Sequence, residues 1–201
     1  MDKDLNKQKI EEFLLVANEY CLLLENIKEI SKKAFFEKSQ KLLGLLYLKA
    51  TALPVEEDIN DAFIEKFVTE EDWHFIQNGV ATKLGGSESF FEVFTPETLE
   101  TDNQESVSLS ECLTDIYQDA KDIVTLYRIG NEESLSNALF ECKMNFERFW
   151  GPRLLASLSI MHNLIYGNDN LEDENEINQD TNTPNTDNWL INKRFNDFNE
   201  E

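Results

Sequence analysis

The chain of 201 residues is 41% hydrophobic and 11% aromatic, which is enough to bury a core and excludes a protein disordered throughout. Only 7 Gly and 4 Pro are present, too few for the closely spaced turns of a β-sandwich or barrel. The net charge of −22, from 18 basic and 40 acidic residues, excludes nucleic-acid binding through a broad basic surface and disfavours a membrane partner. The acidic excess begins after residue 54, because residues 1–54 carry nine basic and eight acidic side chains.

The cysteines and the hydropathy pattern indicate a cytoplasmic protein. Cys21, Cys112 and Cys142 are odd in number and form no Cys-x-x-Cys pair, which is typical of reduced cysteines in the cytosol. The first residues contain no apolar signal region, and no apolar run is long enough to span a bilayer.

Apolar residues recur at helical spacing along most of residues 1–166. Ser31 and Thr69 are suitable N-caps, and Gly130 is a suitable stop. The second predicted helix is apolar on nearly its whole circumference, so we expect it at the centre of the core. The pattern predicts six helices, over about residues 5–27, 32–53, 70–84, 110–129, 132–149 and 152–166.

The connections between these helices follow from glycine and proline. The short link at Gly130 predicts an antiparallel hairpin between the fourth and fifth helices. Gly151 is expected to cap the last helix and Pro152 to open it, so the chain should restart there. Between the third and fourth helices we expect a short apolar patch at residues 90–94 and a polar surface loop at 95–106.

The composition changes abruptly after residue 166. Residues 167–201 carry ten acidic and two basic side chains, and their first part has too few apolar residues to offset the entropy of ordering. A short amphipathic island at 188–199, with Trp189 and Phe195, follows this linker. The sequence therefore predicts one all-α domain over residues 1–166, a single compact bundle of about six helices, and a disordered acidic C-terminal tail over 167–201.

Asp115, Asp119 and Asp122 are three and four residues apart, so their carboxylates share one side of the fourth helix. Such a group binds a divalent ion when a facing helix adds Glu or His. The stripe also lies opposite the apolar face of its helix, so we favour a solvated acidic surface. His162, on the last predicted helix, does not follow a Glu by three residues, and we expect no metal and no cofactor.

Trp150, Arg153 and His162 form the most unusual stretch. A cation in the first turn of a helix is disfavoured by the helix dipole, so a negatively charged group must offset this cost at Arg153. It either pairs with a carboxylate such as Asp115, Asp119 or Glu147, which we favour, or joins free backbone N–H groups in an anion site. Trp150 is expected to plug the core. His162 is interpreted as a partly buried structural histidine, with a ligand or base as the alternative.

Familiar catalytic motifs are missing from the sequence. It contains no Gly-x-Ser-x-Gly, no phosphate-binding Gly-rich loop and no cysteine with an evident histidine partner, so no catalytic residue is predicted.

A set of segments stands out in combination: Leu113–Lys121, Cys142–Glu147, Trp150–Gly151 and His162–Leu164, together with Phe67–Asp72 and Phe91–Phe94. In these segments the chain resembles a bacterial family without assigned activity, the domain of unknown function five-zero-six-three. The resemblance covers about residues 5–166 and implies a cytoplasmic helical protein.

We hold two main hypotheses. The first is a non-enzymatic regulatory or scaffolding module that contacts another protein with a basic surface, through its acidic exterior and the island at 188–199. The second is a protein that binds a small molecule or a divalent metal ion. This hypothesis includes an enzyme that acts on the bound molecule. Its site would lie between the last three helices and use Asp115, Asp119, Trp150, Arg153 and His162. Mimicry of nucleic acid by the acidic middle is a weaker third alternative.

Overall fold

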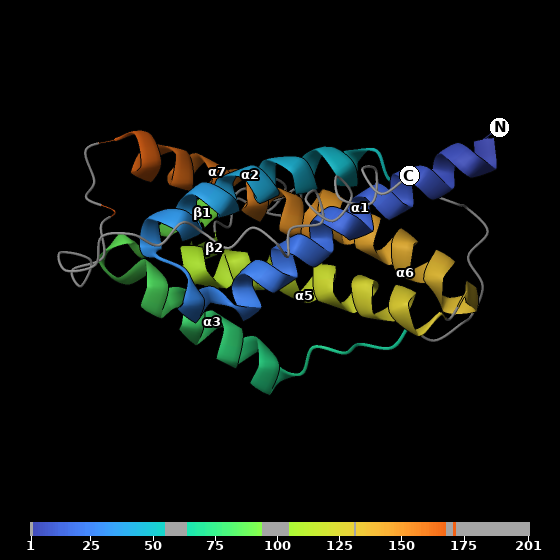
Figure 1. Cartoon of the computed structure of the whole chain (residues 1–201), viewed down its shortest axis with the longest axis horizontal. Coiled ribbons are helices and arrows are strands. Elements are labelled where there is room, and N and C mark those ends of the chain that lie inside the picture. Colours follow the sequence, from blue (N-terminus) through green and yellow to red (C-terminus); the bar gives the residue numbers. More distant parts are fainter. Residues whose placement is uncertain (1, 55–63, 94–104, 131, 168–170, 172–201) are drawn as a thin grey trace, which may run out of the picture.

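The structure, a computed structural model, describes residues 2–54, 64–93, 105–130, 132–167 and 171. Within these residues six α-helices pack along one another, which confirms the all-α class (Figure 1). The α-helices are α1 (Asp2–Glu25), α2 (Lys32–Thr51), α3 (Glu70–Leu84), α5 (Leu109–Ile129), α6 (Glu132–Asn145) and α7 (Gly151–Tyr166). Shorter helical turns are η1 (Ile27–Glu29), η2 (Gly85–Ser87) and η3 (Phe146–Trp150), and the strands are β1 (Phe90–Val93) and β2 (Glu105–Ser108).

Local capping explains where α2 and α3 begin. The Ser31 side chain accepts a hydrogen bond from the Ala34 N–H at 3.2 Å, as the sequence predicts. At α3, Thr69 and Asp72 form a reciprocal capping box, in which each side chain accepts from the backbone N–H of the other. These side chains satisfy N–H groups that have no partner within the helix, so the two starts are fixed by sequence alone.

A β-ribbon stands where the sequence predicts an apolar patch and a loop. Strands β1 and β2 pair antiparallel, from Phe90 opposite Ser108 to Val93 opposite Glu105. The ribbon leads directly into α5, whose N-cap is Ser108 in a capping box with Glu111, two residues before the predicted start. The strands are four residues each and pair across a connection, so neither carries a period long enough to recognise.

Helix α5 lies at the centre of the molecule, and the prediction that the second helix does so is wrong. Helix α5 packs against α1, α3, α6 and α7, and is buried over most of its length. Helix α2 packs against α1 and α7 and leaves Leu45 and Leu48 46% and 60% exposed. A helix rich in leucine on all sides need not be surrounded, because exposed apolar residues are common on folded proteins.

The chain does not restart at Gly151. A π-helical segment, η3, carries α6 directly into α7, and the Gly151 N–H donates to the Phe146 carbonyl. Gly151 has ordinary right-handed helical angles instead of capping α7 from an extended conformation, while Pro152 occupies the first turn as predicted. The predicted break in the helix is absent. The π-turn joins the Phe146 carbonyl to the Gly151 N–H, five residues on, so this hydrogen bond closes before Pro152 and does not need the N–H that proline lacks.

Most of the predicted tail, including the island at 188–199, lies outside the described residues. Leu171 is an exception, since it is buried against the core although the sequence assigns it to the disordered segment. One leucine among polar neighbours has no periodicity that would reveal such a contact. Among the described residues, no helix has both the length and the apolar character required to cross a membrane.

Candidate functional site

Three aspartates on successive turns of α5 form a buried polar centre. The side chains of Asp115 and Asp122 are only 18% and 9% exposed, and Asp119 is half-buried. The prediction of a solvated acidic face is therefore wrong. Periodicity along α5 identifies its polar side correctly, but only the fold shows that other segments return to cover that side.

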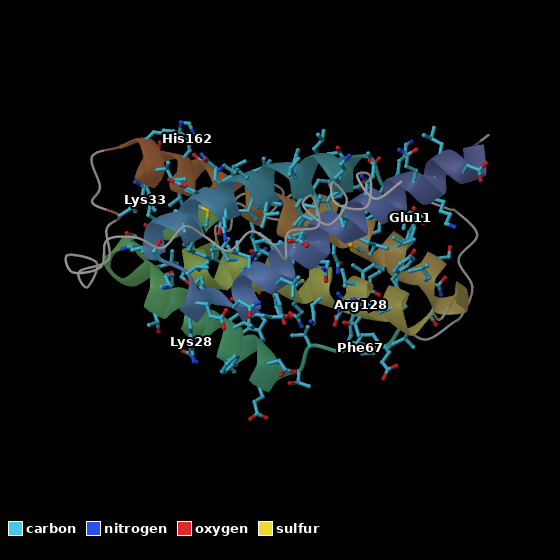
Figure 2. All side chains as sticks on the ribbon, in the orientation of Figure 1. Glu11, Lys28, Lys33, Phe67, Arg128 and His162 are labelled. Carbon is cyan, nitrogen blue, oxygen red and sulfur yellow. The ribbon has the colours of Figure 1, made fainter. Side chains whose placement is uncertain are left out.

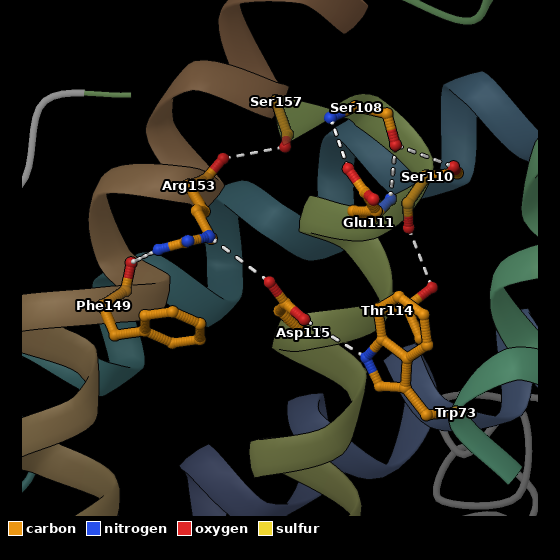
Figure 3. A network of polar contacts seen from close by, with 9 residues as sticks. All are labelled: Trp73, Ser108, Ser110, Glu111, Thr114, Asp115, Phe149, Arg153 and Ser157. Atoms are coloured by element: carbon orange, nitrogen blue, oxygen red, sulfur yellow. Dashed lines mark hydrogen bonds and ion pairs between the residues drawn. The ribbon is translucent and has the colours of Figure 1, made fainter. Parts of the chain in front are cut away.

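Asp115 forms a buried ion pair with Arg153 of α7 (Figure 3). Asp115 Oδ2 lies 3.3 Å from Arg153 Nε, and Asp115 Oδ1 accepts a hydrogen bond from Trp73 Nε1 at 3.2 Å. The Arg153 guanidinium carbon is 3.8 Å from the centroid of the Phe149 ring, and its Nη1 donates to the Phe149 carbonyl at 3.4 Å. These contacts confirm that Arg153 pairs with a carboxylate, and they identify Asp115 as that partner.

The other three explanations considered for Arg153 were Asp119, Glu147 and an anion site, and Asp119 accepts a hydrogen bond from Asn145. Glu147 is half-exposed and lies 3.8 Å from Lys143, one turn away on its own helix. An anion site at the start of α7 requires free backbone N–H groups, whereas the helix continues from η3 and Gly151 donates to Phe146.

Asp119 lies one turn further along α5 and contacts α6. Its Oδ1 accepts a hydrogen bond from Asn145 Nδ2 at 2.8 Å. Burial raises the pKa of Asp119 to about 6, although the Asn145 hydrogen bond and the charge of Lys66 act in the opposite direction. Burial also raises the pKa of Asp115 to about 6, opposed by Arg153 and by the Trp73 hydrogen bond. Both side chains therefore remain mainly ionised at neutral pH, at a cost in free energy.

Asp122 fixes the segment that leads into α3. Its Oδ1 accepts hydrogen bonds from the backbone N–H groups of Phe67 and Val68, at 2.8 and 3.0 Å. Lys66 Nζ lies 3.9 Å from Asp122 Oδ2 and 2.6 Å from Glu141 Oε1 of α6. The cavity beside these groups has a volume of only about 10 Å³, which leaves no space for a small-molecule ligand.

Trp150 belongs to the core, as predicted. It is 2% exposed, and its ring centroid lies 4.7 Å from that of Phe146 within η3. Its indole Nε1 is buried and makes no hydrogen bond with the described residues. Trp150 therefore supports the π-helical junction through apolar and aromatic contact.

His162 does not join the other candidate residues. It follows Arg153 by nine residues, which places it on the opposite side of α7, and it is exposed instead of partly buried as predicted. Its Nδ1 lies 3.4 Å from Gln40 Nε2 of α2, and its ring centroid lies 4.7 Å from that of Tyr166. Figure 2 shows His162 at the outer edge of the molecule.

The chemistry of this centre is that of a structural network. Asp115 and Arg153 neutralise each other and stay shielded from water, so neither presents a free charge to a ligand. Among the described residues, no group of three His, Cys, Asp or Glu side chains is placed to hold a metal ion. A ligand-binding role for the five candidate residues stays a prediction.

Sequence reasoning missed several members of this network, including Trp73, Phe149, Asn145 and Lys66. Trp73 lies within the helix predicted over residues 70–84, and its indole N–H donates to Asp115. Asn145 offers a usable signal, because an amide in the last turn of a helix is well placed to bond a neighbouring helix. Lys66 and Phe149 offered no comparable local signal.

Replacing Asp119 by asparagine should stabilise the protein at pH 7.5 by about 1–2 kcal/mol. The folded-state pKa of about 6 exceeds the unfolded value of about 3.9, so this group favours folding below about pH 4 and loses that contribution as the pH rises through 6. Asparagine keeps an oxygen that can accept from Asn145 but carries no charge. Urea unfolding at pH 5 and 7.5 should show a smaller difference between the two pH values in the variant.

The matched control is Glu71→Gln, which removes one negative charge from an exposed position on α3. It should leave the pH dependence as it is in the unsubstituted chain. An Asp119→Asn variant with the same pH dependence as the unsubstituted chain would show that burial of this carboxylate is not costly.

The chain is an all-helical domain whose buried aspartates are paired with side chains and backbone groups of the same chain. The sequence matches the family described as "Domain of unknown function (DUF5063)" over residues 4–167, and the chain belongs to this family, as the resemblance implies. Protein BF1032 from Bacteroides fragilis, known from a crystal structure, is 33% identical, with a TM-score of 0.69 over 79% of this chain and 93% of that one. No curated protein matches the sequence.

Proposed function

We propose that this protein is a non-enzymatic interaction module that binds a segment of a basic partner protein in a groove between α1, η1 and α3. The observation that carries the proposal is a groove of about 470 Å³ beside Phe75, whose side chain is 64% exposed. A large aromatic side chain beside a concave apolar surface is typical of sites that receive a protein partner.

The groove has an apolar floor. Leu24, Ile27 and Ile76 are buried beneath it, and Gly79 of α3 lies against Ile27, where a Cβ would make an ordinary contact at 3.4 Å. This floor suits an apolar side chain of the partner, packed against the Phe75 ring. The apolar contact would supply the affinity.

The net charge of the molecule favours a basic partner. Glu71 and Asp72 precede Phe75 by four and three residues, so they extend the same side of α3 beyond the groove, and both are exposed. The groove itself is lined by Glu25, Lys28 and Lys83, and both lysines contact groups of this chain. Lys28 Nζ lies 5.4 Å from the Phe75 ring centroid, and Lys83 donates to the Ile30 carbonyl. With a net charge of −22, the protein should attract basic partners at long range and in a salt-dependent way.

Selection of peptides from a random library on the full chain, at low salt, tests this function. We expect basic peptides with an apolar anchor. Phe75→Ser should weaken their binding at least about tenfold, which corresponds to about 1.4 kcal/mol and is ordinary for an aromatic anchor. Glu71→Lys should weaken the binding and reduce its salt dependence.

Ile129→Ser is the matched control, since Ile129 is equally exposed, at 62%, but lies at the end of α5. It should leave the affinity unchanged. Selected peptides that are acidic, or that bind the Phe75→Ser variant as well as the unsubstituted chain, would refute the proposed site.

A further inference from the structure

A second apolar surface lies on α2 and the end of α7, on the outer edge where Figure 2 shows His162. Leu45, Leu48 and Tyr166 are 46%, 60% and 68% exposed there. A shallow depression of about 710 Å³ extends between Gly44, Leu45 and Tyr166. A Cβ at Gly44 would meet nothing within 4 Å, so this side of α2 is open. Helix α2 thus has an apolar face that the described residues leave without a partner helix.

We propose that residues 188–199 of the same chain dock on this α2–α7 face. Ile191, Phe195 and Phe198 are four and three residues apart, the spacing of an apolar stripe on one face of a helix. An amphipathic helix that lays such a stripe into a shallow apolar groove is a common mode of recognition. Trp189, next to this stripe, provides an additional large apolar side chain.

The acidic residues on both sides of the docking segment complement the charge of α2. Helix α2 carries five lysines and one glutamate. Residues 172–201 carry nine acidic side chains, of which eight lie at 172–187 and 200–201. Residues 188–199 themselves carry Lys193, Arg194 and Asp197, so this segment would bind through its apolar side chains. Lys41 borders the depression directly, and Lys33 lies at the same end of the molecule in Figure 2. The acidic flanks are therefore attracted to the most basic of the described helices.

The connecting segment is long enough for this contact. Leu171, the last described residue, and Trp189 are 18 residues apart, which spans about 60 Å when fully extended and about 23 Å on average for a flexible chain. Helix α2, with 20 residues, is about 30 Å long. The tether also raises the local concentration of the segment to the millimolar range, so a weak site can be occupied.

This docking concerns a different face from the groove beside Phe75, and either proposal can fail alone. When docked, the segment covers Leu45 and Leu48, and the α2–α7 face is closed to other proteins. A partner that binds residues 188–199 would expose that face.

Hydrogen exchange of the full chain tests the docking. Amides of residues 188–198 should exchange at least about tenfold more slowly than in the free peptide of residues 186–201, given the tethered concentration. The double variant Leu45→Glu, Leu48→Glu should abolish this protection. Phe75→Ser should preserve it, because Phe75 belongs to the other groove. Circular dichroism confirms that each variant is folded.

A reciprocal variant, Trp189→Ser with Phe195→Ser, places no change in the helical body. It should shift the ring NMR signals of His162 and Tyr166, which line the depression. Exchange of residues 188–198 at the free-peptide rate would overturn the proposal. Protection that survives in the Leu45→Glu, Leu48→Glu variant, or that grows with protein concentration and so indicates a second copy, would also overturn it.

Discussion

Replacing Arg153 by methionine is expected to lower the free energy of unfolding by about 3–5 kcal/mol at pH 7.5. Arg153 is almost completely buried, with 3% of its side chain exposed, and its Nε lies 3.3 Å from Asp115 Oδ2. Methionine fills a similar volume but leaves the Asp115 carboxylate buried opposite an apolar side chain. It also removes the contact between the guanidinium and the Phe149 ring.

The pH dependence of this loss is specific to the ion pair. The pKa of Asp115, raised by burial to about 6 even with Arg153 present, should rise further in the variant. At pH 5 the carboxyl group then takes up a proton and the buried charge disappears. Urea unfolding should therefore show a smaller loss at pH 5 than at pH 7.5.

A double variant separates the pair from general damage to packing. Asp115→Asn in the Arg153→Met background retains an oxygen for Trp73 and removes the unpaired charge, so it should recover about 1–3 kcal/mol at pH 7.5. If Arg153 served a ligand site instead of the fold, its replacement would leave the stability unchanged or increase it. That result would revive the second hypothesis, of a binding site between the last three helices.

Gly151→Ala is expected to lower the free energy of unfolding by about 2–3 kcal/mol, as overpacking of a rigid site does. A Cβ at Gly151 would lie 2.2 Å from the Phe146 carbonyl oxygen and 3.1 Å from the Phe146 ring. The carbonyl oxygen is part of the π-helical backbone and accepts the Gly151 N–H, so it cannot move without opening that turn. Thermal and urea unfolding measure the effect.

Gly44→Ala in α2 is the matched control, with the opposite sign. A Cβ at Gly44 meets nothing within 4 Å, and alanine is favoured over glycine within a helix by about 1 kcal/mol. We therefore expect Gly44→Ala to stabilise the protein and Gly151→Ala to destabilise it. Similar gains from both would mean that the junction between α6 and α7 is an ordinary α-helix.

The sequence located the helices well because their signals are local. Apolar periodicity identified α1, α3 and α5, and the caps at Ser31 and Thr69 form as expected, since each involves residues within one turn. The β-ribbon and the π-helical η3 were missed. A ribbon depends on pairing across a connection. The π-turn is local, between Phe146 and Gly151, but apolar periodicity does not distinguish it from an α-helical turn.

The candidate site was predicted in part, for a similar reason. The pairing of Arg153 with a carboxylate was predicted, and Asp115 was among the three considered, but the premise was a free helix start at Gly151 that the structure does not have. The sequence could not decide that Asp115 is the partner, because this depends on how α7 lies against α5. The exposed position of His162 likewise depends on how α7 lies against α2.

The amino-acid sequence by itself determined that this chain forms helices, where most of them begin and end, and that the protein is strongly acidic. These properties depend on residues within a few positions of one another, or on composition alone. The tertiary structure decided that α5 is central, that its aspartates are buried and paired, and that the other described residues leave an apolar face of α2 uncovered. Such features arise from contacts between residues far apart in the chain, where burial turns an ordinary surface carboxylate into a costly charge that requires a partner.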